Sequence, residues 1–475
     1  MTTPRLTRQP GQRPGTGIVH LGLGAFFRAH GAIYIAEAMA AHPGDWGILG
    51  VSLKSPGTRD ALQPQGWDYT AVEQGPDGEI PRVVNVLNGV LVAPEDPGAV
   101  LAAMADPAVK IVSLTVTEKG YCHEPATGEL DFDHVDIIHD MEHEMPRSAP
   151  GYLVRALAMR RRAGLKPFTV MTCDNLPENG KVVRKVVLSL ARVIDPGLAD
   201  WIETRGAFPS TMVDRIVPAT KPEDIARLAK ATGRLDEAPV MHEPFRQWVI
   251  EDDFVDGRPD FSAVGVQMVR DVTPYEHMKL RMLNGTHSSL AYLGYLAGHE
   301  TIADTVADPV FAAYVQHLWQ REIIPALTPP PGESLTAYAE ALLARYRNPA
   351  IRHRTWQIAM DGSQKLPQRL LGTLRENAAA GRDSAGLLLA VAGWMRYVGG
   401  VDEKGQPIEV KDPLAARLRA LSDSAETPEG KVAALLGVTE IFSPDQAAGL
   451  KPGVTAAYRS LLELGSRGAA QKIAG

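Results

Sequence analysis

The feature that most constrains the fold of this chain is a change of pattern near Pro274. Before that point, short apolar runs typical of buried strands alternate with helical patterns. These apolar runs are 17–22, 46–53, 83–92, 110–117 and 168–173. Strands that alternate with helices indicate a parallel sheet with helices on its faces. We therefore predict an α/β fold for the first part of the chain.

After about residue 275 the pattern is different, because apolar residues recur at helical spacing. The stretches that we expect to be helical are 280–296, 309–327, 335–346, 385–397 and 454–464. A chain of 475 residues is long enough for two or three domains of ordinary size. We predict a flexible tail at 1–16, an α/β domain at 17–275 and a mostly α-helical domain at 276–475.

Bulk composition argues against several classes of function. The net charge is -7, whereas nucleic-acid-binding domains usually carry a basic patch or stripe. Only two cysteines occur, Cys122 and Cys173, so we expect a reducing cytoplasm rather than a disulfide framework. No window approaches the ~18 uninterrupted apolar residues of a membrane-spanning helix. His139 and His143 have metal-ligand spacing, but a solvated helix face explains that pair better. We predict no nucleic-acid partner, no membrane partner and no metal.

A glycine turn lies between the first predicted strand and the first predicted helix. Glycine lets the backbone approach a pyrophosphate, and a helix N-terminus presents unpaired N–H groups to it. The third glycine of the usual dinucleotide fingerprint is replaced by Phe27, so the match is incomplete. The alternative is a tight turn without a ligand. The candidate cofactor-binding residues at this turn are Gly22, Gly24, Ala25, Phe26, Phe27 and Arg28.

The end of the second predicted strand lacks the acidic residue that usually holds the adenosine ribose of NAD. Lys54 and Ser55 occupy this stretch, and nothing acidic follows the strand before Asp60. A lysine and a serine at this point could accept the 2′-phosphate of NADP. On the residues alone, the preference between NAD and NADP stays open.

The clearest sign of chemistry is a set of three polar residues, Lys279, Asn284 and His287, in a predicted helix. At about 100° per residue they fall within an arc of roughly 140°, so they could line one wall of a pocket. An amine that can lose its proton, an amide that can donate to a charged oxygen and an imidazole that can hold a hydroxyl suit alcohol–carbonyl chemistry without a metal. The alternative is a half-buried helix whose polar residues cap neighbouring elements.

Two further segments add candidate site residues. Asn175 follows a predicted strand, and loops at the carboxyl ends of parallel strands face the ligand crevice. Its amide could donate to the same oxyanion as Asn284, or it could cap the next helix. Asp214 and Arg215 are an acid and a base in an apolar run, where Asp214 could border the pocket or the two could form a structural pair.

Together these segments resemble the polyol-specific long-chain dehydrogenase/reductase (mannitol dehydrogenase) family. The opening signature of the family is similar to 18–30, with Phe27 where its members commonly have histidine. Its catalytic signature is matched by the lysine, asparagine and histidine named above, and its Cys-Asp-Asn segment is matched by 173–180. Within the family, the fructuronate reductase (D-mannonate oxidoreductase) branch is most similar. The stretches that carry this likeness are 113–122, 243–252 and 352–368.

The resemblance implies a Rossmann-type dinucleotide-binding domain followed by a helical substrate and catalytic domain. It also implies NAD as the cofactor, with NADP not excluded, and hydride transfer without a metal. In this scheme Lys279 is the general acid/base, Asn175 and Asn284 form an oxyanion pair, and His287 orients a substrate hydroxyl. Asn175 also borders the cofactor, and the glycine turn lies under its pyrophosphate.

The implied activity is the reversible oxidation of D-mannonate to D-fructuronate by a cytoplasmic monomer or weak homo-oligomer. A sugar acid needs a partner for its carboxylate, and an arginine guanidinium can donate two parallel hydrogen bonds to a carboxylate. The candidate substrate-binding residues are Asp214, Arg246, Lys365 and Lys119, with Arg352 and Arg354 as further cations. The alternative is mannitol 2-dehydrogenase or another polyol dehydrogenase of the family, for which a neutral pocket lined by amides is expected.

Overall fold

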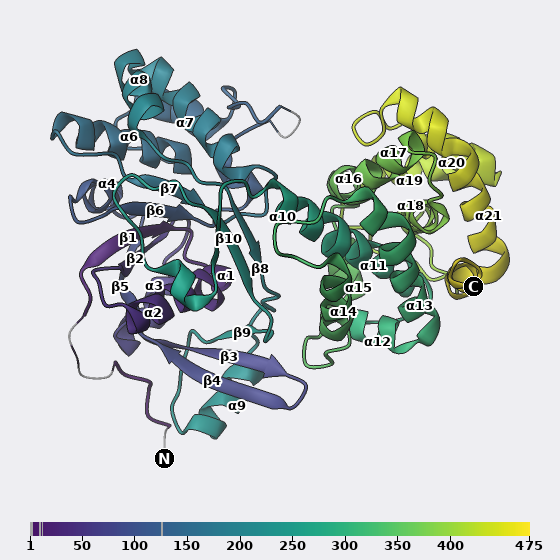
Figure 1. The fold of residues 1–475 in the computed structure, drawn as a ribbon, viewed down its shortest axis with the longest axis horizontal. Coiled ribbons are helices and arrows are strands. Elements are labelled where there is room, and N and C mark those ends of the chain that lie inside the picture. The colour runs from purple at the N-terminus through teal and green to yellow at the C-terminus, as the bar shows by residue number, and fades with distance from the viewer. Residues whose placement is uncertain (1–2, 9–10, 12, 125–126) are drawn as a thin grey trace. The chain divides into compact units, whose positions relative to one another are not determined.

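A computed structural model of the chain describes residues 3–8, 11, 13–124 and 127–475. The chain divides into two compact units, Met1–Thr273 and Pro274–Gly475 (Figure 1). Strands β1 to β11 all belong to the first unit, and the second unit is built from helices.

Five parallel strands form the central sheet of the first unit. They are β1 Thr16–Leu21, β2 Gly47–Ser52, β5 Leu87–Val92, β6 Ile111–Leu114 and β7 Thr169–Thr172. Their order is β5-β2-β1-β6-β7, so the chain extends the sheet on one side of β1 and then returns to extend the other. This is the order of a Rossmann-type sheet, whose ligand crevice lies where the order reverses, at the carboxyl ends of β1 and β6. The predicted α/β fold is confirmed.

Both faces of this sheet are buried, which explains why its strands are almost continuously apolar. Val19 and Leu21 of β1 belong to one buried cluster, whereas Ile18 belongs to another. In the same way, Val112 of β6 belongs to the first cluster and Ile111 to the second. Because successive side chains of a strand point to opposite faces, the two clusters cover the two faces of the sheet.

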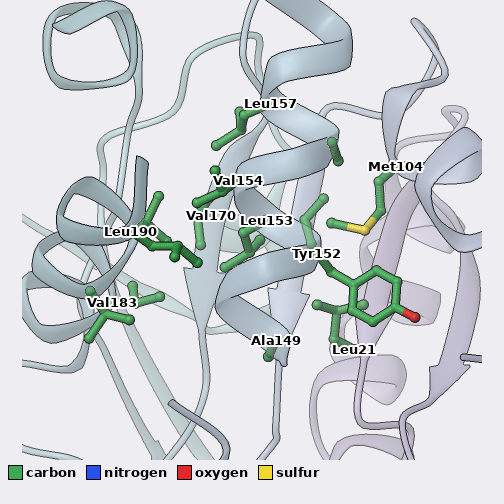
Figure 2. Packing of buried hydrophobic residues seen from close by; sticks show 14 of the residues in the cluster. Leu21, Met104, Ala149, Tyr152, Leu153, Val154, Leu157, Val170, Val183 and Leu190 are labelled. Atoms are coloured by element: carbon green, nitrogen blue, oxygen red, sulfur yellow. The ribbon is translucent and has the colours of Figure 1, made fainter. Parts of the chain in front are cut away.

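Among the described residues, five helices contribute to the first cluster. They are α4 Pro97–Ala105, α5 Val135–Glu142, α6 Ala149–Arg162, α7 Asn179–Ile194 and α8 Pro196–Arg205. Figure 2 shows Leu153 and Val154 of α6 pointing toward Val170 of β7, with Leu190 of α7 beside them. The long, continuous apolar contact between α6 and the sheet fixes the positions of the strand ends.

Helices α4 and α6 begin where the sequence supplies side-chain caps. The Asp96 carboxylate accepts a hydrogen bond of 2.9 Å from the backbone N–H of Ala99, and the Ser148 hydroxyl accepts one of 3.0 Å from Gly151. Each cap is followed within two positions by proline. Both features satisfy or remove N–H groups that the first turn of a helix leaves without partners.

The second cluster contains residues of helices α1 and α2. The bounds of these and the other helices of the unit are α1 Ala25–Ala29, α2 Gly31–Ala41, α3 Gly57–Leu62, α5 Val135–Glu142, α8 Pro196–Arg205 and α9 Pro222–Thr232. Short 3-10 turns lie at η1 Gln63–Gln65, η2 Glu118–Tyr121 and η3 Phe261–Val264.

Two small sheets complete the first unit. One has the order β11-β10-β8 and the other β4-β3-β9. Their strands are β3 Tyr69–Gly75, β4 Gly78–Val84, β8 Thr211–Asp214, β9 Val240–His242, β10 Gln247–Glu251 and β11 Gln267–Val269. The prediction of a single strand at 83–92 is wrong, because the chain crosses from β4 to the central sheet at Asn85 and Val86. An apolar run gives no sign of such a change of partner.

The described part of the predicted tail makes specific contacts with the first unit. Leu6 is buried, and its backbone N–H donates to the carbonyl of Leu235 at 2.7 Å. The Arg8 guanidinium donates to the carbonyl of Leu87 at 3.0 Å. In this respect the structure differs from the flexible tail predicted for 1–16, because the apolar Leu6 side chain is buried within the unit.

Helices of the second unit surround α18, nearly all of which is buried. Their bounds are α10 Thr273–Met278, α11 Thr286–Leu296, α12 Ile302–Ala307, α13 Pro309–His317, α14 Leu335–Tyr346, α15 Thr355–Ala359, α16 Gly362–Leu366, α17 Gly372–Ala379, α18 Ala385–Val398, α19 Ala415–Asp423, α20 Pro428–Leu436 and α21 Pro444–Ala474. Three π-helical turns interrupt or extend them, η4 Lys279–Gly285, η5 Leu318–Ile323 and η7 Pro367–Leu371, and a 3-10 turn lies at η6 Ile324–Ala326. Within the described residues, none of the helices combines the length and the apolar character that a bilayer-spanning segment requires.

Candidate active site

The glycine turn lies at the point where the strand order of the central sheet reverses. Gly22 has φ +88°, and a Cβ atom there would lie 2.2 Å from the carbonyl oxygen of Thr115, just beyond β6. Only glycine fits this backbone conformation and this close approach of the two strand ends. At Gly24 the nearest described atom to such a Cβ would be the carbonyl oxygen of Gly22, 3.8 Å away, so there is room for a methyl group. The predicted turn therefore leaves room for a ligand to approach the start of α1.

Two of the candidate cofactor residues turn their side chains into the first unit. The ring of Phe27 stacks on His20 with centroids 3.4 Å apart, and it fills the space beside Gly31. The buried Arg28 guanidinium donates to the carbonyl of Ala238 at 2.5 Å. The side chains of Phe27 and Arg28 thus support the turn, which leaves the backbone of α1 as the part that can meet a cofactor.

His20 is a residue that the sequence did not single out. Its two ring nitrogens lie 2.8 Å from the Ser113 hydroxyl and 2.9 Å from the Thr115 hydroxyl, so it ties β1 to the end of β6. Burial lowers the pKa of His20 to about 3, so the ring is neutral. A buried neutral imidazole with two hydroxyl partners holds the two strand ends together at the crevice.

Asp174 organises the next loop of the crevice. Its carboxylate accepts hydrogen bonds from the backbone N–H groups of Val116 and Thr117, each at 2.9 Å, and from the Tyr121 hydroxyl at 2.6 Å. Burial raises the pKa of this carboxyl group despite those hydrogen bonds. The loops after β6 and β7 are thereby joined, and Asn175 follows directly in an exposed position.

Asn179, the second asparagine of the segment 173–180, has a structural role. The Asn179 side chain donates to the carbonyls of Asp174 and Thr211, each at 2.9 Å, and accepts from the Thr211 backbone N–H. Helix α7 starts at Asn179 without a side-chain cap. Both roles considered for Asn175, an oxyanion donor or a helix cap, stay predictions.

The other candidates of the first unit occupy different surroundings. Asp214 is buried at the end of β8, and Lys119 is exposed on a 3-10 turn. The Arg246 guanidinium forms an ion pair with Glu37 at 2.6 Å and lies over the ring of Tyr34, 4.2 Å from its centroid. Arg246 is thus held by a carboxylate of its own unit.

In the second unit, the predicted catalytic residues are all buried. Lys279 is 9% exposed, Asn284 8% and His287 7%. The α-helical geometry predicted for this segment is wrong, because Lys279–Gly285 is a π-helical turn and regular α-helix resumes at α11. An i→i+5 turn has more residues per turn than an α-helix. The directions of the Lys279, Asn284 and His287 side chains therefore differ from those predicted for an α-helix. Such turns occur frequently at functional sites.

The carbonyls of this π-helical turn bind side chains from other helices. The Trp319 indole N–H donates to the carbonyl of Met282 at 2.9 Å, and the Tyr346 hydroxyl donates to the carbonyl of Leu283 at 2.9 Å. The Thr286 hydroxyl also donates to Met282, at 2.6 Å. These bonds stabilise a backbone geometry that is rare, because they satisfy carbonyls in the middle of the turn.

A second π-helical turn, Pro367–Leu371, packs against the first. A Cβ atom at Gly285 would lie 2.7 Å from the carbonyl oxygen of Arg369, so the close approach of the two backbones requires glycine. Pro367 has no backbone N–H and cannot donate within its helix. The two turns therefore fix each other, and Arg369 is positioned beside the predicted catalytic segment.

The polar groups of the segment suit a ligand. The Asn284 amide nitrogen is buried and has no hydrogen-bond partner among the described residues. Burial, and after it His353 and Arg369, lowers the pKa of His287 well below its ordinary value, so this ring is neutral. The Lys365 ammonium donates to the carbonyl of Met360 at 2.5 Å. An amide donor and a neutral imidazole can both hydrogen-bond a polar substrate.

The histidine pair set aside as a metal site is a local stack. His139 and His143 lie with ring centroids 4.2 Å apart and interplanar angle 5°. Over the described ranges, no group of three or more His, Cys, Asp or Glu side chains is arranged to hold a metal ion.

A Rossmann-type unit with an open glycine turn, joined to a helical unit with a buried lysine, amide and imidazole, defines the class of two-domain dehydrogenases. Comparison with known families agrees. Residues 16–263 match the mannitol dehydrogenase Rossmann domain, and residues 271–462 match the mannitol dehydrogenase C-terminal domain. The chain belongs to the mannitol dehydrogenase family, and it is an oxidoreductase that acts on a CH–OH group.

Relatives within this family differ in their substrates. The chain is 50% identical to D-mannonate oxidoreductase of Escherichia coli (strain K12), over 95% of this chain and 94% of that protein. It is 41% identical to mannitol 2-dehydrogenase of Aspergillus fumigatus, over 92% and 89% of the two chains.

A solved structure has the same fold. Mannitol 2-dehydrogenase of Pseudomonas fluorescens, in a ternary complex with NAD and D-mannitol, matches with a TM-score of 0.87 and 38% identity. The match covers 99% of this chain and 97% of that one.

Proposed function

We propose that this chain catalyses the NAD-dependent, reversible oxidation of D-mannonate to D-fructuronate. The observation that carries the proposal is the 50% identity, over almost the whole chain, to a D-mannonate oxidoreductase. The basic groups that surround His287 add support, because a sugar acid brings a negative charge that a polyol lacks.

In this proposal the first unit holds the cofactor. The glycine turn fits a dinucleotide, since Gly22 allows the strand ends to approach and no described atom crowds Gly24. The relative from Pseudomonas fluorescens was solved with NAD. When bound, NAD accepts a hydride from the carbinol carbon of the substrate. Lys54 and Ser55 are exposed after β2, so NADP remains the alternative cofactor to be measured.

Proton transfer is assigned to Lys279. In the oxidative direction its neutral amine takes the proton of the substrate hydroxyl, and in the reductive direction its ammonium returns that proton. A free lysine has a pKa near ~10.4, so alkaline conditions increase the fraction of the neutral amine. We therefore expect oxidation to be faster at alkaline pH and reduction to be faster near neutrality.

The stabilisation of negative charge on the reacting oxygen is assigned to two amides. As the hydroxyl loses its proton, negative charge develops on that oxygen, and Asn175 and Asn284 donate hydrogen bonds to it. The buried amide nitrogen of Asn284, which has no hydrogen-bond partner in the part of the chain that the structure describes, supports this part of the proposal, because a preorganised donor stabilises the charge without rearrangement. His287 holds a neighbouring hydroxyl of the substrate, and Lys365 contacts the substrate as a further donor.

The second candidate function is oxidation of a neutral polyol such as D-mannitol. It is favoured by the likeness to the structure that was solved with D-mannitol, at 38% identity. The same lysine and amides would serve this reaction, because the reacting centre is again a secondary alcohol.

Initial rates on purified protein separate these functions. D-mannonate and D-mannitol are each offered with NAD and with NADP, at matched concentrations. The proposal expects strong turnover of D-mannonate with NAD and little turnover of D-mannitol. Turnover of D-mannitol without D-mannonate would contradict it and favour the polyol reading. The better cofactor also decides whether Lys54 and Ser55 bind a 2′-phosphate.

A further inference from the structure

Basic side chains of the second unit gather around His287. After burial, the groups that lower the pKa of this histidine are His353, Arg369, Arg345 and Lys365, in that order. The ring of His353 lies 4.7 Å from that of His287, at an angle of 72°. The surroundings of the predicted hydroxyl-binding histidine are therefore electropositive.

Arg369 lies against the predicted catalytic segment. Its backbone carbonyl packs against Gly285, and its guanidinium donates to the Ser288 hydroxyl at 3.0 Å. Ser288 follows His287 directly in the chain and is buried. A guanidinium presents its five N–H donors in a fixed, planar fork, and the bond to Ser288 orients that fork. The guanidinium therefore lies close to His287, and the packing of the two π-helical turns holds the backbone of Arg369 in place.

Two further groups lie beside the guanidinium. Lys365 precedes Arg369 by four residues on the same continuous helical segment, so both side chains leave it on nearly the same side. His353 has a buried Nδ1 atom with no hydrogen-bond partner in the described part of the chain. Burial, followed by the charges of Lys365 and Arg369, lowers the pKa of His353 to about 4, so its ring is neutral and can donate one N–H.

Three of the cations that the sequence suggested for a carboxylate, Arg246, Arg352 and Arg354, form ion pairs with protein carboxylates. Arg246 is paired with Glu37 at 2.6 Å in the first unit. Arg352 and Arg354 are exposed, and their guanidinium groups lie 3.4 and 3.5 Å from the carboxylate of Glu300. A substrate carboxylate would have to compete with these protein carboxylates.

We propose that Arg369, together with Lys365 and His353, forms the subsite that binds the carboxylate of a sugar-acid substrate. Arg369 supplies a planar fork that matches a carboxylate, Lys365 supplies a second positive charge, and His353 supplies a neutral donor. This inference rests on the proposed function and deepens it, because it assigns the preference for an acid over a polyol to one named side chain. His287 then holds a hydroxyl of the same substrate.

The test is Arg369→Met, which keeps the length of the side chain and removes its charge and donors. We expect kcat/KM for D-mannonate to fall about 100-fold, mainly through KM, because a charge partner of the substrate is lost. Activity on D-mannitol, even if low, should not fall. Arg369→Lys keeps the charge without the planar set of donors, and we expect its kcat/KM for D-mannonate to be about tenfold higher than that of Arg369→Met.

The matched control is Arg375→Met, an exposed arginine six residues further along in α17, which should leave both activities unchanged. Melting temperatures establish that each variant is folded. If wild-type protein oxidises D-mannonate and Arg369→Met does so equally well, this inference is wrong while the proposed function stands. If Arg369→Met and Arg369→Lys both lose D-mannonate and D-mannitol activity to the same extent, Arg369 is structural and the inference is also wrong. If wild-type protein oxidises D-mannitol but not D-mannonate, the proposed function fails and the subsite fails with it.

Discussion

The two units present their functional groups in opposite ways. In the first unit the glycine turn offers its backbone, while the side chains of Phe27 and Arg28 face inward and support the turn. In the second unit the π-helical turn Lys279–Gly285 offers its side chains, while Trp319 and Tyr346 bind its backbone. A backbone surface suits a pyrophosphate, which is common to all dinucleotides, whereas side chains decide which reaction takes place. Substitutions at the glycine turn should therefore affect cofactor binding and stability, and substitutions at the π-helical turn should affect turnover.

The largest expected effect is that of Gly22→Ala. The added methyl group would meet the carbonyl of Thr115 at 2.2 Å, and the φ of +88° is unfavourable for alanine. We expect the free energy of unfolding to fall by more than about 4 kcal/mol, measured by denaturant unfolding of the purified protein. Gly24→Ala is the control, because its methyl group would lie 3.8 Å from the carbonyl oxygen of Gly22, an ordinary van der Waals contact. It should leave stability almost unchanged and weaken only NAD binding; equal stability losses in both variants would refute this account of the turn.

Asn284→Ala tests the side-chain half of the comparison. The loss of an oxyanion donor should lower kcat by about 100- to 1000-fold, or roughly 2.7–4 kcal/mol of barrier. The melting temperature should hardly change, because the amide nitrogen has no hydrogen-bond partner among the described residues. Asn179→Ala serves as the opposite case, since that amide bridges Asp174 and Thr211 and its loss should lower stability. A large loss of stability in Asn284→Ala would show that its amide is structural.

The pH dependence of stability probes the support of the glycine turn. Folded His20 has a pKa of about 3, below the value of about 6.5 expected for the unfolded chain. Below pH 6.5, His20 therefore binds a proton in the unfolded state but not in the folded state. This contribution to stability is complete above pH 6.5 and is lost as pH falls toward 3, at about 1.4 kcal/mol per pH unit. Denaturant unfolding at pH 7, 6 and 5 should show a shallower loss in His20→Asn than in wild type; parallel curves would rule out a neutral His20.

A smaller effect is expected for Tyr346→Phe, which removes the hydroxyl that binds the carbonyl of Leu283. We expect a loss of about 1 kcal/mol in unfolding free energy and a several-fold lower kcat, because the π-helical turn loses one support. Tyr314→Phe is a matched control, since its buried hydroxyl donates at the same distance of 2.9 Å to the carbonyl of Gly386, a residue of α18 and not of the turn. It should cost similar stability and leave kcat unchanged. The same fall in kcat in both variants would show that general loosening of the unit, and not the turn, lowers the rate.

Local patterns were sufficient to predict most of the first unit's central sheet, apart from the division of 83–92 between two sheets. The apolar run 17–22 and the glycines after it specify a buried strand and a tight turn, and both are found. The hydrogen bonds of His20 with Ser113 and Thr115 could not be predicted, because they join residues more than 90 positions apart. The packing of Phe27 beside Gly31, in place of the usual third glycine, also becomes visible only in three dimensions.

The second unit was less predictable at the site itself. The spacing of Lys279, Asn284 and His287 identified the segment, but nothing local distinguishes a π-helical turn from an α-helix. The groups that stabilise the turn come from positions 37 and 63 residues away in the chain. Arg369 lies in a helical stretch without a motif, so its place beside Gly285 required the fold.

The most direct test of the central claim is Lys279→Ala, with turnover and NAD binding measured on the same preparation. If the second unit supplies proton transfer and the first unit binds the cofactor, kcat should fall by about 10²–10⁴-fold. The dissociation constant for NAD should stay at its wild-type value. A near-normal kcat, or a loss of NAD binding that matches the loss of turnover, would contradict this division of roles.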